Sequence, residues 1–168
     1  AFIILGISFW TALDLFEGAP KNLKSYDIIP LLFISLTIIA GTFVSGMDAG
    51  LVYNTFPYMG DGIIPIEYGN LGFIDPFENP VTAQFHHRLL ASITLIIIII
   101  YSIHYIISNP INLRILLLLF AIICQFIIGI FTLLYSVPIT LGAMHQFVGV
   151  LLFLSALWVL HSPKKNTF

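Results

Sequence analysis

Two histidines lie near the same edge of two different apolar stretches, His87 in QFHHRLLASITLIIIII and His145 in PITLGAMHQFVGVLLF. A buried ionisable side chain in a lipid-spanning chain is costly enough to suggest a functional site by default. Imidazole is also a common axial ligand of haem iron. This pair is therefore the most direct clue to function in the sequence.

The two histidines are predicted to lie at the same depth. His87 is seven residues past Pro80, and His145 is seven residues past Pro138. On a helix this places both imidazoles roughly 10 Å below the helix starts. On facing helices of a bundle, such a pair can hold one flat macrocycle, whereas zinc would require a third and usually a fourth ligand. The alternative is a hydrogen-bonding pair that joins two membrane helices.

The residues around His87 refine this hypothesis. His86 lies about 100° around a regular helix from His87, so the two cannot reach the same metal. We expect His87 to be the ligand, with His86 as the alternative. Arg88 can bind a haem propionate, because guanidinium pairs bidentately with carboxylates. The alternative for Arg88 is a side chain that extends to the membrane interface.

Two other histidines are predicted to lie far from this layer. His104 is seventeen residues beyond His87, which is about 25 Å deeper on a helix. His161 lies near the chain end, beside Lys164 and Lys165. We expect both to be solvated or interfacial.

The composition predicts an integral membrane protein. Of 168 residues, 59% are hydrophobic and 8% are charged, too few polar residues to coat a soluble domain. The net charge of -2 with no basic run does not favour nucleic acid as a partner. Cys124 stands alone in an apolar run and is expected to be a small core residue without an internal disulfide.

Four stretches are long enough to span a membrane, which takes roughly 20 helical residues. They cover 30–50, 80–106, 110–135 and 138–160, and each begins with a proline. Asn79 and Asn109 precede two of them as expected N-caps. The fold class predicted is an all-α membrane protein with a four-helix bundle over 30–160.

The remaining segments are assigned around this bundle. Residues 1–16 are apolar from the start, with no initiator Met or basic n-region, and are expected to end a preceding transmembrane helix of a longer protein. Residues 17–29 form an inner loop and 161–168 an inner tail. The long outer loop 51–79 is rich in Gly, Pro and aromatics, which is typical of an ordered cap or of an interfacial aromatic belt.

The charged residues predict the orientation. Lys and Arg flank the two chain ends and the 107–114 turn, whereas 48–79 contains none and carries five acidic residues. By the positive-inside rule both termini face the cytoplasm or matrix and 51–79 faces out. The exception is Arg88, at the outer end of its span.

The motifs GTFVSGMDAGLVYNTFPYMG, FENPVTAQFHHR and PITLGAMHQ resemble the C-terminal half of haem A synthase, of the proteobacterial and mitochondrial type. The resemblance covers residues 40–160. It implies an oxidoreductase of the bacterial plasma membrane or mitochondrial inner membrane. That family oxidises a methyl group of haem O to a formyl group, which makes the haem A of terminal oxidases.

The resemblance also implies which half of such a protein carries out catalysis and which half binds the haem cofactor. Family members resemble two tandem four-helix bundles, and the first is understood to hold haem O and a catalytic Glu three residues before a histidine. The second holds haem B, and His87 and His145 match its axial ligands. Gln84 occupies the position of that Glu, and ISFWTALDL resembles the last helix of the first bundle. We therefore expect haem B as cofactor and no catalytic residue in this chain.

The resemblance makes haem O and an electron donor the expected partners, besides membrane lipid. Haem O synthase, oxidase assembly factors and a second copy of the chain are further candidates. The residues alone support a rival function equally well, a b-type cytochrome subunit that transfers electrons without catalysis. Two histidines that fill both axial positions of the iron leave none for substrate.

Overall fold

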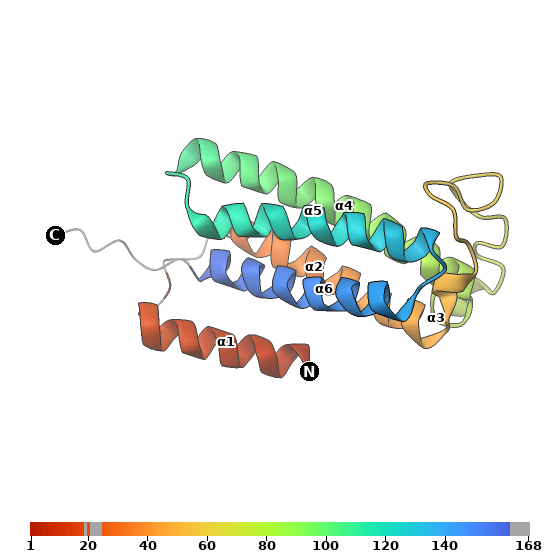
Figure 1. Ribbon diagram of the computed structural model, residues 1–168, viewed down its shortest axis with the longest axis horizontal. Helices are drawn as coiled ribbons and strands as arrows, with labels where there is room; N and C mark the ends of the chain where they lie inside the picture. Colours follow the sequence, from red (N-terminus) through yellow and green to blue (C-terminus); the bar gives the residue numbers. More distant parts are fainter. Residues whose placement is uncertain (19, 21–24, 162–168) are drawn as a thin grey trace.

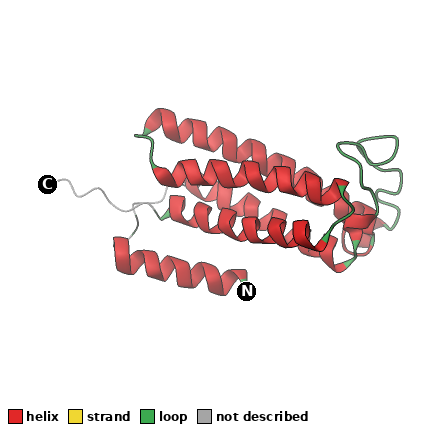
Figure 2. Ribbon diagram, viewed as in Figure 1, coloured by secondary structure: helices red, strands yellow, loops and turns green. Residues whose placement is uncertain are grey.

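The protein was analysed as a computed structural model that describes residues 1–18, 20 and 25–161. The described residues form helices and loops without a strand (Figure 2). The α-helices are α1 (Phe2–Glu17), α2 (Ile29–Gly46), α3 (Asp75–Glu78), α4 (Pro80–Ser108), α5 (Leu113–Leu134) and α6 (Ile139–Leu160).

Helices α2, α4, α5 and α6 form an antiparallel four-helix bundle (Figure 1). Within the described residues they are the four helices long and apolar enough to cross a membrane, so the predicted all-α membrane bundle is confirmed. Helix α1 packs beside α6. Residues 47–79 and the turn after α5 lie at one end, called the outer end here, and the turn between α4 and α5 lies at the other, the inner end. Lys21, Lys24, Lys164 and Lys165, on which the predicted orientation rests, lie outside the described residues.

Asparagine caps begin two of the spans, one of them at an unexpected position. Asn79 accepts a hydrogen bond from the Val81 N–H at 3.0 Å, which confirms its predicted role. Asn109 is not the cap of α5, because the helix begins at Leu113, three residues later than expected, and Asn109 instead follows the last residue of α4. Asn112 is the cap, accepting from the Ile115 N–H at 3.2 Å.

The first span is shorter than predicted. Helix α2 ends at Gly46, not at residue 50. Asp48 adopts the left-handed backbone conformation with a φ of 50°, which cannot continue a right-handed helix. A short 3-10 turn, Ala49–Leu51, then leads into residues 52–79, which are called the outer segment.

Buried apolar packing is concentrated in the inner half of the bundle. The core includes Ile98 of α4, Leu118 of α5 and Leu152 of α6. By contrast, no residue is fully buried over 85–93 of α4, 123–131 of α5 or 139–148 of α6. The side chains of this outer-half layer are therefore more accessible from the surface of the bundle than those of the layer beneath it.

A buried carboxylate organises the outer segment. Asp75 accepts hydrogen bonds from the Gly69 and Leu71 N–H groups, both at 2.9 Å, and from the Asn79 amide at 2.9 Å. The Thr82 hydroxyl also donates to it. Burial opposes ionisation of Asp75, but these hydrogen bonds outweigh it and hold the pKa of the carboxyl well below its usual value. The segment is thereby fastened to the start of α4.

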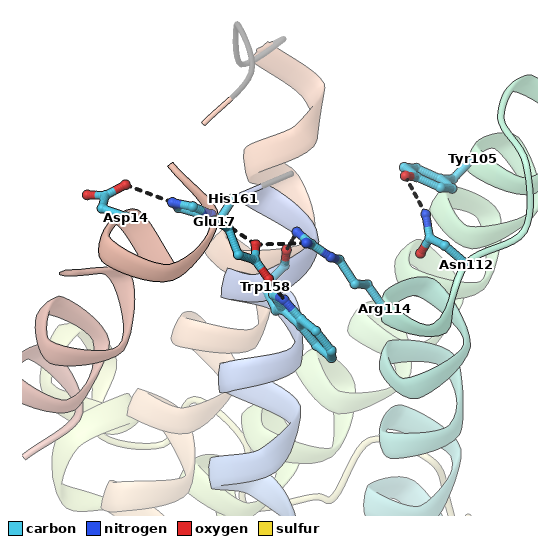
Figure 3. Close-up of polar contacts among 7 residues, drawn as sticks. All are labelled: Asp14, Glu17, Tyr105, Asn112, Arg114, Trp158 and His161. Atoms are coloured by element: carbon cyan, nitrogen blue, oxygen red, sulfur yellow. Dashed lines mark hydrogen bonds and ion pairs between the residues drawn. The ribbon is translucent and has the colours of Figure 1, made fainter. Parts of the chain in front are cut away.

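A polar cluster joins three helices at the inner end (Figure 3). The His161 imidazole lies 2.7 Å from an Asp14 carboxylate oxygen, and Arg114 pairs with Glu17 at 2.7 Å. The Trp158 indole N–H also donates to Glu17 at 3.1 Å. The prediction of a solvated or interfacial His161 is wrong, since its side chain is 0% exposed. The packing of α1 against α6 covers it.

Replacement of Asp75 by Asn should loosen the outer segment, because an amide is a weaker acceptor for the N–H donors. The folded pKa lies below the unfolded value of about 3.9. The stabilisation is therefore complete above that value and is lost as the pH falls through the folded pKa. We expect faster amide hydrogen exchange at Gly69 and Leu71 in Asp75→Asn at neutral pH. The exposed Glu78→Gln is the matched control, and equal exchange in the two variants would contradict this role for Asp75.

Candidate functional site

The structure brings His87 and His145 together in this outer-half layer of the bundle. Their ring centroids are 6.4 Å apart, with the ring planes at 86°. His87 comes from α4 and His145 from α6, two helices that begin at the outer end. The expectation that both rings share one depth matches this geometry.

His87 is held against the backbone of α2. Its Nδ1 lies 3.1 Å from the Thr37 carbonyl oxygen, and because a carbonyl can only accept, Nδ1 is the protonated nitrogen. The unprotonated Nε2 is then free to bind a metal, the usual arrangement for a ligating histidine. Gly41 permits the close approach, since a Cβ there would come within 3.1 Å of the ring.

His145 is held against α5 by a side chain. The Gln125 amide nitrogen lies 3.2 Å from Nε2 of His145. A Cβ at Gly129 would lie 2.9 Å from the imidazole, and one at Gly149 would lie 3.3 Å from the Gln125 amide. His145 Nδ1 and Gln125 Oε1 are buried without hydrogen-bond partners. Gln125 was not predicted to belong to the site, although a polar glutamine within an apolar membrane span is itself a sign of function.

These residues fit a haem iron between the two rings. Two metal–imidazole bonds of about 2 Å, with the distance from each nitrogen to its ring centre, span roughly the observed separation. Nδ1 of His145 is buried without a hydrogen-bond partner, as a nitrogen that binds a metal would be in the metal-free chain. Both candidate ligands are imidazoles whose rings face each other, a donor set suited to haem.

His86 points to a different part of the molecule. Its Nε2 lies 3.2 Å from the Tyr68 hydroxyl of the outer segment, and its ring also contacts Phe85. Gln84, one turn before His87, donates to the Tyr53 carbonyl at 3.0 Å. Both side chains thus contact the outer segment, His86 through Tyr68 and Gln84 through Tyr53.

Arg88 fastens the outer segment to α4. Its guanidinium donates to the carbonyls of Tyr53 at 2.6 Å and Thr55 at 2.8 Å, with a longer contact of 3.5 Å to Tyr58. Its Nε is buried and has no partner. Sequence reasoning did not foresee the carbonyl partners, since nothing in the local pattern indicates them.

The structure also describes the two other residues singled out from the sequence, His104 and Cys124. His104 is exposed near the inner end of α4, with its ring 5.8 Å from that of Tyr26. Cys124 is a free, partly buried thiol on α5.

Curated relatives share the sequence over most of this chain. A protein of Wolbachia pipientis wMel named "Heme A synthase" is 38% identical over 87% of the chain and 41% of its own length. Proteins of the same name from Nitrosospira multiformis and Granulibacter bethesdensis are 36% and 37% identical. They match over 99% and 96% of the chain, and over 50% and 45% of their own lengths. The chain thus spans about half the length of these relatives.

No solved structure matches the chain significantly. The sequence model of one family, described as cytochrome oxidase assembly protein, matches residues 1–157. With its facing histidines, its four membrane-spanning helices and these relatives, the chain belongs to the COX15-CtaA family of cytochrome oxidase assembly proteins, the family of the haem A synthases.

Proposed function

We propose that this chain is the haem B-binding, C-terminal half of a haem A synthase, an oxidoreductase that converts a methyl group of haem O to a formyl group. The observation that carries the proposal is the facing of His87 and His145 at a ring separation of 6.4 Å. Family membership supports the reaction class.

The residues of this chain would hold the cofactor and leave it no open position. His87 would offer Nε2, with its Nδ1 proton held by the Thr37 carbonyl, and His145 would offer a ring nitrogen from α6. Haem B, when bound, supplies a one-electron carrier. A site with both axial positions filled by protein suits electron transfer and excludes substrate from the iron.

Gln84 supports placing the chemistry elsewhere. An amide neither takes up nor releases a proton at neutral pH, and this one is engaged with the Tyr53 carbonyl. The catalytic carboxylate and haem O would then belong to the remainder of the protein. The same residues favour a b-type electron carrier as the second candidate. An upstream bundle with a Glu three residues before a histidine would decide for the enzyme.

The proposed setting is the bacterial plasma membrane or the mitochondrial inner membrane, with the inner end of the bundle on the cytoplasmic or matrix side. Residues 48–79, at the outer end, contain no Lys or Arg, whereas Arg114 lies at the start of α5 near the inner end, in accord with the positive-inside rule. Proposed partners are an electron donor, haem O, haem O synthase and oxidase assembly factors, with a second copy of the chain as a further candidate.

The first test addresses the axial ligands. The purified chain should bind one low-spin, six-coordinate haem B, and His87→Ala or His145→Ala should abolish that spectrum. His86→Ala is the matched control, since this neighbouring ring faces Tyr68, and it should leave the spectrum unchanged. Loss of the spectrum in His86→Ala, with retention in His87→Ala, would reassign the ligand.

The second test addresses Arg88, whose unpartnered Nε–H is proposed to reach a haem propionate. Arg88→Ala should weaken haem B binding by about 1–3 kcal/mol, the scale of a charge-assisted hydrogen bond. Binding of haem dimethyl ester, which lacks free carboxylates, should be insensitive to the variant. Equal losses with both haems would leave Arg88 only the role of holding the outer segment.

The third test addresses the division of labour. After incubation of the chain alone with haem O and a reductant, chromatography should detect no haem A. The proposal places no acid or base of this chain beside the iron. A full-length relative serves as the positive control. Product formed by the chain alone would reverse the assignment of the two halves and make Gln84 part of an active site.

A further inference from the structure

Two buried atoms beside the histidine pair lack hydrogen-bond partners and are complementary. One is Nδ1 of His145 and the other is Oε1 of Gln125. Their side chains already touch, through a contact of 3.2 Å between the Gln125 amide nitrogen and His145 Nε2.

The protonation states follow from this contact. An amide nitrogen can only donate, so Nε2 of His145 accepts and the ring proton resides on Nδ1. A donor, Nδ1–H, and an acceptor, Oε1, are therefore both unsatisfied on adjacent side chains. Buried polar groups are nearly always paired in native proteins, so the arrangement is incomplete as it stands.

We propose that Gln125 is a positioning residue for His145, an inference that rests on the haem-binding function proposed above. With the amide turned, Oε1 accepts from a proton on Nε2 at the same 3.2 Å contact. The unprotonated Nδ1 then binds the iron, so both unsatisfied atoms gain a partner. A ligating histidine almost always donates its other ring N–H to such an acceptor.

Two glycines leave room for this exchange. Gly149 of α6 lies against the Gln125 amide, where a Cβ would come within 3.3 Å. Gly129 of α5 lies against the imidazole, where a Cβ would come within 2.9 Å. The terminal torsion of a glutamine is broad and roughly two-fold, so the amide can present either nitrogen or oxygen to the ring.

The two axial ligands are then supported differently. His87 donates to the backbone carbonyl of Thr37. A side-chain substitution at Thr37 does not remove this acceptor. His145 relies on a side chain, whose strength as an acceptor sets the basicity of the imidazole. A stronger acceptor favours the oxidised iron and lowers the reduction potential, and loss of the acceptor raises it.

The test compares Gln125→Glu, Gln125→Leu and the control Gln146→Leu, in which an exposed glutamine adjacent to His145 is changed. Redox titration of the haem-loaded chain should show a lower potential in Gln125→Glu and a higher one in Gln125→Leu. The ratio of oxidised to reduced haem at fixed potential should change by up to tenfold, about 59 mV for a one-electron couple. The control should match the wild type.

The outcomes separate the two proposals. Shifts of opposite sign support the role of Gln125, since a merely structural defect would not reverse sign with the acceptor. Unchanged potentials, or shifts of the same sign, in variants that keep the six-coordinate spectrum would overturn it while leaving haem binding intact. Should Gln125→Leu fail to fold, Gln125→Glu alone must lower the potential. A wild-type chain without a bis-histidine haem spectrum would overturn the proposed function itself.

Discussion

Hydrocarbon offers no hydrogen-bond partner, so every polar group inside this bundle must find one within the protein. This constraint governs how the histidine pair is built. His87 on α4 finds the Thr37 carbonyl on α2, and His145 on α6 finds Gln125 on α5. Each imidazole thus uses a helix other than its own, and all four helices of the bundle are needed to orient the two rings.

The same constraint links the pair to the outer segment. Gln84 and Arg88, one turn before and one residue after His87, both donate to backbone carbonyls of that segment. Asp75 gathers the far part of the segment onto the start of α4. The segment is therefore attached to the helix that carries one of the rings, on both sides of that ring's position.

Local signals explain which features could be predicted from the sequence. Apolar length gave the four spans, and equal spacing from two prolines gave the common depth of His87 and His145. Features that depend on tertiary neighbours could not be foreseen. The burial of His161 requires α1 to cover it, and the carbonyl partners of Arg88 lie 30 to 35 residues away along the chain. The cap of α5 was expected at Asn109, directly before Pro110, but the helix begins only at Leu113 and Asn112 caps it.

The contacts between α5 and α6 share one axial register. Arg114 donates to the Trp158 carbonyl near the inner end, Gln125 meets His145 midway, and Thr132 donates to the Leu141 carbonyl near the outer end. The residue numbers in each pair add up to nearly the same value, as they must when two antiparallel helices keep a constant offset. Sliding by a single residue, about 1.5 Å, would stretch all three contacts together. The height of the His145 ring is thus fixed by polar contacts distributed along the whole seam, including the Arg114 guanidinium at the opposite end of the bundle.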